Sequence, residues 1–459
     1  MLTKDMNERL TRVGPGTPCG ELLRCYWIPV AATSQLLDNP VRKIRILGED
    51  LVLYRNTKGG LGLIGERCLH RLVDLQYGIP DECGLRCPYH GWLYDESGEC
   101  IERPMEAYPT AKVNRKLKAY PVRELGGLVF AYMGPLPAPQ LPKWDLYVWP
   151  NAVRQIAVNV LDCNWLQCQE NTGDPTHSVW AHGHLFRYVL EKEGRLSDRA
   201  ASKDHTLKNR IKWANGIKEV TAQRTKYGFE KFICYSKELG ADEDEKRRHS
   251  TVIFPFYTNT GGPGSPRSEY QIRVPIDDTH TLHICYQVYA APHGIKAPEQ
   301  KIIPWYEPPL FDEKGKPILD YVLAQDALVW WAQGDLVDRS QEMLGRTDVP
   351  IVLLRRQLDE QIKVVEEGKD PMNCFRENPG EILFGAGEEP PGWDPDDWTK
   401  MQLYGGGQSY RKSYHKGFAE DDADRYGPAM DLVVELHRRI AETGMFEVAE
   451  NPTMRTEPA

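Results

Sequence analysis

The sequence predicts an α+β protein in which a small antiparallel β domain precedes a larger domain of sheet and helices. Two observations predict this. Residues 26–135 are rich in short alternating or β-branched runs that are bounded by turn residues. Residues 145–366 instead mix strand-like runs with stretches of helical periodicity. The chain shows no internal repeat, so we expect two different domains.

Strands and tight turns dominate the first of these domains. Residues 41–47 and 51–54 are runs that suit strands, and residues 96–99 suit a tight turn between two others. A proline-rich stretch at 134–142 then interrupts the pattern. Such a stretch is typical of a stiff linker, so we expect the second domain to begin just after it.

The second domain is predicted to open with a strand and a helix. The strand-like runs lie at residues 153–160, 250–254 and 281–288, and the helical stretches lie at 162–182 and 317–366. The charged segment 240–248 is predicted to be a loop. Beyond residue 368 the chain is rich in proline, glycine and acid, and an amphipathic helix is expected at 427–443.

Composition limits the partners. The 459 residues carry a net charge of −9, which argues against nucleic acid and against an anionic membrane surface. Neither a leader-type apolar stretch nor a run of 18 apolar residues occurs, so we expect a cytoplasmic protein without a membrane span. Eleven cysteines are too few for a disulfide scaffold, and in a reducing compartment clustered Cys and His indicate metal.

The strongest motif is a pair of Cys-His loops. Cys68 and His70 form C-x-H, and after sixteen residues Cys87 and His90 form C-x-x-H. In a Rieske [2Fe–2S] centre two cysteines hold one iron and two histidines hold the other. A structural Cys₂His₂ zinc site is the alternative, although zinc sites more often pair like with like. Cys83 and Cys100 lie nearby and are expected to be small hydrophobic residues or free thiols and not ligands.

A second candidate metal site surrounds His177 and His182. Asp174 and Pro175 resemble a helix cap followed by proline in the first turn, which places His177 at the start of a helix. Five residues turn about 140° around an ideal helix, so His182 would have to leave the helix, or the helix to tighten. Gly183 favours a helix end there. A carboxylate would complete the facial triad of a non-haem iron oxygenase.

The two motifs together resemble the oxygenase (alpha) subunits of Rieske non-haem iron ring-hydroxylating enzymes, and in particular the phthalate-dioxygenase-like branch. The resemblance covers about residues 8–360, including the opening LTRVGPGTPCGELLRCYWIPV, the pattern D-P-x-H-x₄-H, and the segments 325–334 and 338–340. It implies that His177, His182 and Asp326 bind a mononuclear Fe(II). The acids that compete with Asp326 are Asp335, Asp338 and Glu342. His184 is a spare candidate, and Trp331 stands where many relatives carry an acid.

The resemblance also assigns roles to Asp174 and Asn171. Asp174 matches an aspartate that bridges a cluster histidine of one subunit and an iron histidine of its neighbour, which here implies His90 and His177. Such a carboxylate orients imidazoles and links two centres. Asn171 matches a residue beside the iron. This arrangement needs a head-to-tail homotrimer.

The implied domains are an N-terminal segment (1–25), a Rieske [2Fe–2S] domain (26–140), a catalytic iron domain (141–367) and a C-terminal extension (368–459). The implied function is oxidation of an aromatic acid with O2 and with electrons from an NAD(P)H-dependent reductase, a ferredoxin or both. We expect O-demethylation of a lignin-derived methoxylated acid, of one ring or a biphenyl, with release of formaldehyde. The alternatives are phthalate-like ring dihydroxylation and a Rieske electron-transfer protein without oxygenase activity. A basic residue should meet the substrate carboxylate, and residues 200–250 hold many candidates.

Overall fold

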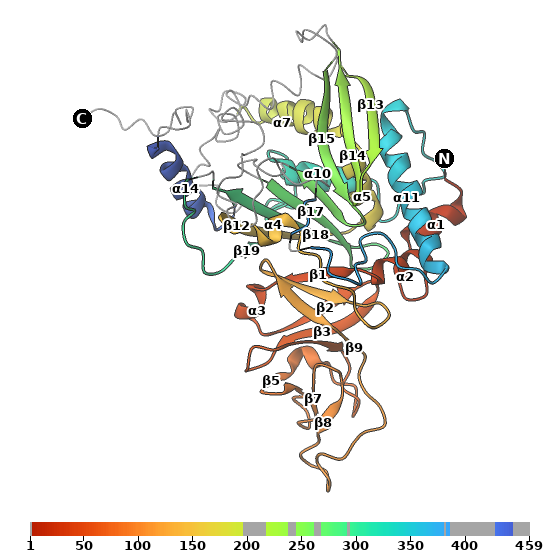
Figure 1. Ribbon diagram of the computed structural model, residues 1–459, viewed down its shortest axis with the longest axis vertical. Coiled ribbons are helices and arrows are strands. Elements are labelled where there is room, and N and C mark those ends of the chain that lie inside the picture. Colours follow the sequence, from red (N-terminus) through yellow and green to blue (C-terminus); the bar gives the residue numbers. More distant parts are fainter. Residues whose placement is uncertain are drawn as a thin grey trace, which may run out of the picture.

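The computed structural model describes residues 2–195, 217–236, 245–260, 268–291, 294–380, 382–385 and 427–443. It is an α+β protein with a narrow β end and a broad end of sheet and helices (Figure 1). The predicted fold class is therefore confirmed. In the part of the chain that the structure describes, no helix is long and apolar enough to cross a membrane.

The narrow end is built from two four-stranded antiparallel sheets. The first sheet contains β2 (Val41–Ile46), β3 (Glu49–Arg55), β4 (Leu61–Gly65) and β9 (Ala119–Tyr120). The second contains β5 (Ile79–Asp81), β6 (Gly84–Arg86), β7 (Leu93–Tyr94) and β8 (Cys100–Glu102), with η1 (Leu75–Tyr77) before it. The apolar side chains of these strands form a small core of their own, in which Cys68 and Cys87 are buried.

A third sheet connects this end to the rest of the molecule. It contains β1 (Trp27–Ala32), β11 (Leu128–Tyr132) and β10 (Val122–Leu125), and it shares one large hydrophobic core with the broad end. The N-terminal helices α1 (Lys4–Thr11) and α2 (Pro18–Arg24) and the short α3 (Gln35–Asp38) precede or flank it. The proline-rich stretch 134–142 contains no helix or strand, as predicted, and Trp27 Nε1 donates to the Pro139 carbonyl within it.

The broad end holds an eight-stranded sheet of order β13-β14-β15-β16-β17-β18-β12-β19. Its strands are β12 (Ala152–Leu161), β13 (Ile217–Arg224), β14 (Gly228–Tyr235), β15 (Glu245–Ile253), β16 (Tyr257–Thr260), β17 (Ser268–Pro275), β18 (Thr281–Ala290) and β19 (Trp305–Tyr306). The three predicted strands of this domain are all present. The predicted loop at 240–248 is wrong for residues 245–248, because pairing with residues 232–235 of β14 outweighs their charge. Residues 240–244 lie outside the described part.

The two faces of this sheet differ in chemistry, since residues directly opposite each other on neighbouring strands share a face. One face carries Tyr257, Ile272 and Ile284, which belong to the large core. The other face is polar although it is buried. Its cross-strand rows are Thr258, Gln271 and Cys285, then Arg273, His283 and Asn159, then Glu269, Gln287 and Gln155.

Helices flank the sheet, and α4 (Asp145–Val148) packs through Tyr147 on Tyr270 and Tyr286 of the apolar face. The others are α5 (Trp165–Gly173), α6 (His177–Val179), the π-helical η2 (Trp180–Leu185), α7 (Phe186–Lys192), α10 (Val322–Trp331), η4 (Arg346–Asp348), α11 (Val349–Glu366) and α14 (Met430–Glu442). The helix predicted over 317–366 is thus two helices. α10 ends before Gly334, whose φ of +90° favours glycine and stops the helix.

Candidate functional site

The four predicted cluster residues come from two loops of the same geometry. In each loop the cysteine carbonyl accepts from the amide four residues later, at Leu72 and at Gly91. Both of these residues have positive φ, of 60° and 75°. The cysteine amides donate to carbonyls five residues later, at Val73 and Trp92. Two matched turns therefore present two Cys-His pairs to each other at the tip of the narrow end.

The side chains of these loops divide by burial. Cys68 and Cys87 are only 1% and 2% exposed, whereas His70 is exposed and His90 is half-buried. The two imidazole rings are 4.5 Å apart between centroids, and His70 stacks on Trp92 at 4.8 Å. A buried thiol pair beside a more accessible imidazole pair suits a [2Fe–2S] cluster, which these two cysteines and two histidines would hold.

A second cluster lies between α6, η2 and α10. Single ligand atoms of His177, His182 and Asp326 all lie within 4.8 Å of one another. Asp326 Oδ1 is 3.1 Å from His182 Nε2 and 3.5 Å from His177 Nε2. Two imidazoles and one carboxylate, which leave other positions open, form the donor set of non-haem Fe(II) oxygenases.

The local backbone explains how two histidines five residues apart meet. We predicted that the helix would tighten or end at Gly183, and this is wrong. The chain instead widens into the π-helical turn η2 and continues as α7 to Lys192. A π-helix joins residues i and i+5, so it brings His182 back to the face of His177, and such turns are frequent at functional sites.

Hydrogen bonds fix both imidazoles in the metal-binding tautomer. Gln325 Nε2 donates to the Leu319 carbonyl, so its Oε1 is the atom that faces His182 Nδ1 at 2.8 Å. The Nδ1 of His177 likewise contacts the Asp174 carbonyl. Each Nδ1 therefore carries the proton, and each Nε2 points a lone pair at Asp326 Oδ1. That oxygen has no hydrogen-bond donor among the described residues, so the three lone pairs fit a cation between them.

Asp326 is ionised. Burial raises the pKa of its carboxyl, but the positive charge that His182, His177 and Arg273 can carry outweighs burial and holds that pKa at about 2. Burial lowers the pKa of His177, which keeps its imidazole neutral. A carboxylate and a neutral imidazole are the forms that bind metal.

Asp174 lies where α5 ends and α6 begins. Its Oδ1 accepts from the amide and the hydroxyl of Thr176 at 2.7 and 2.6 Å, and from the His177 amide at 3.3 Å. The predicted capping role is thus present, although the N-cap position itself is Thr176. The second oxygen is 3.9 Å from His177 Nδ1. Asp174 consequently holds the turn that presents His177.

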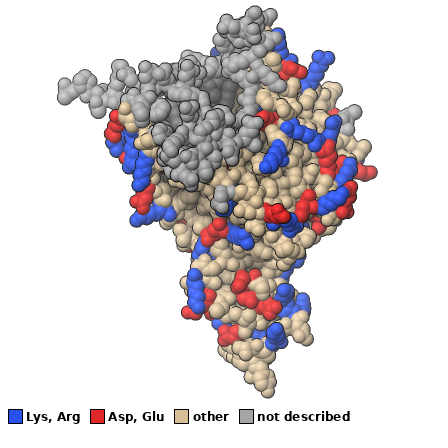
Figure 2. All heavy atoms as spheres, in the orientation of Figure 1, with Lys and Arg blue, Asp and Glu red and all other residues tan. Residues whose placement is uncertain are grey.

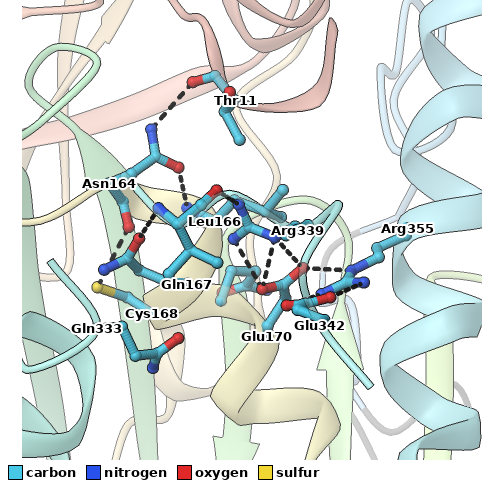
Figure 3. A network of polar contacts seen from close by, with 12 residues as sticks. Thr11, Asn164, Leu166, Gln167, Cys168, Glu170, Gln333, Arg339, Glu342 and Arg355 are labelled. Atoms are coloured by element: carbon cyan, nitrogen blue, oxygen red, sulfur yellow. Dashed lines mark hydrogen bonds and ion pairs between the residues drawn. The ribbon is translucent and has the colours of Figure 1, made fainter. Parts of the chain in front are cut away.

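A buried ion network anchors the helix before this turn (Figure 3). Glu170 lies on α5, one turn before Asp174. Its carboxylate accepts from Arg339 at 2.8 Å and from Arg355 of α11 at 2.5 Å. Arg355 also binds Glu342 at 2.7 Å. Burial raises the pKa of Glu170, but the two guanidinium groups hold it below its ordinary value. The charges of two carboxylates and two guanidinium groups therefore cancel within this buried network.

A cavity of about 630 Å³ opens on the outer side of His177. Asp174 and Asn171 line it, as do His184 and Glu342. His184 stacks on Trp180 at 4.4 Å and lies outside the metal cluster. Asn171 and His177 therefore line the same cavity, and the role of Asn171 beside the iron stays a prediction.

The remaining acids that were considered near Asp326 have other partners. Asp338 accepts from the Ser340 hydroxyl at 2.6 Å, and Glu342 pairs with Arg355. None of these acids, nor Asp335, joins the described metal cluster. Trp331 stacks on Phe311 at 4.9 Å, so an aromatic contact replaces the acid expected there.

Sequence reasoning missed two buried cations on the polar face of the large sheet. Lys231 on β14 is 2% exposed and contacts the Thr172 carbonyl, and burial lowers its pKa to about 7. Arg273 on β17 is 1% exposed, and burial lowers its pKa to about 10. Lys231 lies within the 200–250 range considered for a substrate anchor, and Arg273 lies outside it. Their place on the buried polar face could be identified only from the register of the strands.

Known proteins resemble this chain over most of its length. A family model described as the Rieske [2Fe-2S] domain matches residues 26–121, which favours an iron–sulfur cluster over zinc at the tip. Over 385 residues the chain is 37% identical to the oxygenase subunit of 5,5'-dehydrodivanillate O-demethylase from Sphingobium sp. (strain NBRC 103272 / SYK-6), covering 82% of this chain and 84% of that protein.

Two further comparisons extend this result. The phthalate 4,5-dioxygenase oxygenase subunit of Pseudomonas putida is 30% identical over 402 residues, covering 80% of this chain and 88% of that protein. Among solved structures, Pseudomonas putida CBB5 NdmA (QL mutant with caffeine) superposes with a TM-score of 0.55 at 20% identity, covering 79% of this chain and 99% of that one. The structural match shows a shared fold.

Proposed function

The chain belongs to the Rieske non-haem iron oxygenases as an oxygenase subunit, and from this premise we propose that it O-demethylates a lignin-derived methoxylated aromatic acid of one ring or a biphenyl. The observation that carries this choice is the 37% identity over four fifths of both chains to a dehydrodivanillate O-demethylase subunit. The reaction takes the aryl methyl ether, O2, two electrons and two protons to the phenol, formaldehyde and water.

The electron-transfer alternative is excluded by the same family membership. The dehydrodivanillate O-demethylase and phthalate 4,5-dioxygenase relatives match 82% and 80% of the chain, and both are oxygenase subunits. An oxygenase subunit of this family takes its electrons from a reductase or a ferredoxin. Its cofactors are a Rieske [2Fe–2S] cluster and a mononuclear non-haem iron.

In our proposal, four residues hold the cluster and three hold the iron. The cluster ligands are Cys68, His70, Cys87 and His90. The iron ligands are His177, His182 and Asp326. The matched Cys-His turns support the first set, and the three converging lone pairs support the second. When bound, the cluster supplies one-electron transfer and the iron supplies oxidation by O2.

The chain's own residues orient these groups and exclude water. The Gln325 amide and the Asp174 carbonyl hold the protons on the Nδ1 atoms of the two histidines, so both Nε2 atoms stay available. The burial of His182 and Asp326 keeps bulk water from the inner side of the site. Asn171 is proposed to contact groups that enter from the outer cavity.

We also propose that the working assembly is a head-to-tail homotrimer in the cytoplasm. His90 is half-buried in the loop between β6 and β7 of the narrow end, whereas Asp174 lines a cavity in the broad end. A neighbouring subunit would bring its own tip into that cavity, so that Asp174 bridges His177 and the neighbour's cluster histidine. On the face that Figure 2 draws, acidic and basic side chains are mixed, which agrees with partners other than nucleic acid.

Ring dihydroxylation is the second candidate function. Support for it comes from the 30% identity to a phthalate 4,5-dioxygenase subunit over 80% of the chain. This candidate shares the cofactors, the site and an acidic aromatic substrate with the first. It differs in the product, which would be a cis-diol instead of a phenol and formaldehyde.

A product screen tests the proposal. The purified protein is supplied with NADH, a surrogate reductase and a panel of aromatic acids with and without methoxy groups. Formaldehyde and a phenol in equal amounts, in step with NADH oxidation, are the expected products. A cis-diol without formaldehyde would favour the second candidate, and turnover of neither group of acids would contradict both.

A further inference from the structure

Arg273 has an unusual hydrogen-bonding pattern for a fully buried side chain. Its Nη1 donates to the Thr258 hydroxyl at 2.8 Å and to the Gln271 carbonyl at 3.2 Å, and its Nη2 donates to Gln271 Oε1 at 2.5 Å. Its Nε has no partner among the described residues. Three of the five guanidinium N–H groups are therefore used, and Nε–H and one Nη2–H are free.

The two free donors form one edge of the planar guanidinium group. Gln271 occupies the edge between Nη1 and Nη2, so the Nε–Nη2 edge is the open one. Two parallel N–H groups on one edge match the two oxygens of a carboxylate. Hydrogen bonds to Thr258 and Gln271 thus fix the orientation of the guanidinium group, while its Nε–Nη2 edge has no acceptor among the described residues.

No acid neutralises Arg273 within ion-pair distance in the described part of the chain. The charge that stabilises the guanidinium most is the Asp326 carboxylate. A divalent iron would take up that charge, because one carboxylate and two neutral imidazoles leave Fe(II) with a net charge of +1. Arg273 and, when protonated, Lys231 then face a positive centre inside the protein. Buried charges of this kind are normally paired, so the loaded site lacks an anion.

The surroundings of Arg273 place the missing anion beside the iron site. The guanidinium lies 5.2 Å from the ring centroid of Trp330, which is one helical turn after Asp326 on α10. One turn corresponds to about 6 Å along the helix, a spacing on the scale of one benzene ring with its substituents. Directly opposite Arg273 on β18, His283 is buried, and its Nε2 is also without a described partner.

We infer that Arg273 is the anchor for the substrate carboxylate, with His283 as a neutral neighbour in the same subsite. The inference rests on the proposed function and narrows it, because it requires the substrate to carry a carboxylate about one ring away from the group that is oxidised. Burial lowers the pKa of His283 to about 3, with Arg273 as a further cause, so this imidazole adds a polar contact without adding charge.

Binding without turnover tests the inference. The protein with both metal centres is kept oxidised and anaerobic, and affinities are measured by calorimetry for 4-hydroxy-3-methoxybenzoate, for its 5,5'-linked biphenyl dimer and for the corresponding carboxamides. The wild type is expected to prefer each acid over its carboxamide. R273Q is expected to lose about 10- to 100-fold in affinity for the acids, while its affinity for the carboxamides changes little. R273K keeps the positive charge but loses the two parallel N–H groups. Its affinity for the acids should therefore lie between those of the wild type and R273Q.

A matched control is R154Q. Arg154 is a buried arginine on the opposite face of the same sheet, and it bonds the Leu146 and Trp149 carbonyls. R154Q should leave the preference for acids unchanged. Cluster absorption and iron content check the fold of every variant. If R273Q does not fold, R273K and the wild-type comparison of acid with carboxamide decide the question.

The outcomes separate this inference from the proposed function. Wild-type affinity for the acids in R273Q, or no wild-type preference for acids over carboxamides, would overturn the carboxylate subsite even if formaldehyde is formed. An acid preference that depends on Arg273, together with the absence of formaldehyde from every methoxylated acid, would instead keep the subsite and overturn the O-demethylase function.

Discussion

Gln325 Oε1 accepts the Nδ1 proton of His182 at 2.8 Å, and Gln325 is the residue immediately before Asp326. One short segment of α10 therefore supplies both a carboxylate to the metal cluster and the group that orients a histidine of that cluster. Gln325 and His182 are 143 positions apart in the chain. This relationship makes Gln325 a positioning residue whose removal should act on metal affinity before it acts on the fold.

We expect Q325L to weaken iron binding about 10- to 100-fold, because His182 then loses the partner that fixes its ring and tautomer. Competition with ferrozine measures this affinity, and the visible absorption of the cluster should remain unchanged. Q333L is the matched control, since Gln333 follows the same helix and donates only to the Val329 carbonyl. Equal iron retention in Q325L and wild type would remove the positioning role.

Replacement of Asp326 tests the ligand set directly. D326A is expected to lose the mononuclear iron and more than about 99% of turnover, since two imidazoles alone bind Fe(II) poorly. The cluster should keep its spectrum, because its four proposed ligands lie at the far tip. The control is D338N, which changes a neighbouring acid that bonds only Ser340 and Gln341. Turnover that survives in D326A would show that the iron has another ligand.

Asp174 offers a test of electron passage between subunits. D174N keeps an oxygen that can accept from Thr176 and His177, so the turn and the iron content should survive. Loss of the carboxylate charge is expected to slow oxidation of the pre-reduced cluster by O2 and substrate about 10- to 100-fold. Stopped-flow absorption follows this step in a single turnover. A wild-type rate in D174N would argue against the bridge.

Sequence motifs predicted most of the candidate site, and the register of distant strands supplied the rest. The pattern around His177 and His182 and the late Gln-Asp pair carried a family resemblance, and that resemblance proposed the three metal ligands. The same pattern gave the wrong local backbone, because a spacing of five residues does not reveal a π-helical turn. Arg273 could not be found in this way, since its burial and its open edge depend on β16, β17 and α10 together.

The buried network around Glu170 should matter more for stability than any surface pair. E170Q leaves Arg339 and Arg355 with one carboxylate fewer inside the protein, and breaking such a pair costs about 3–5 kcal/mol. The control is E360Q, which breaks the Arg224–Glu360 pair, whose side chains are 47% and 39% exposed, and should cost less than about 1 kcal/mol. Apparent melting temperatures at a fixed scan rate compare the two. Similar losses in both variants would contradict the weight given to the buried network.

Asp145 should make stability depend on pH in a defined direction. It is fully buried, and desolvation raises its pKa to about 6 in the folded protein, although the Tyr270 hydroxyl that donates to it works in the opposite sense. Because the folded pKa lies above the unfolded value of 3.8, the folded state holds the extra proton, and this contribution is lost as the pH rises through 6. The full loss amounts to about 3 kcal/mol. D145N cannot titrate, so its apparent melting temperature relative to wild type should rise between pH 5 and pH 7.5. Y270F should move the wild-type transition to higher pH, since it removes the hydrogen bond that lowers this pKa. A difference between D145N and wild type that stays constant over this range would mean that Asp145 does not titrate there.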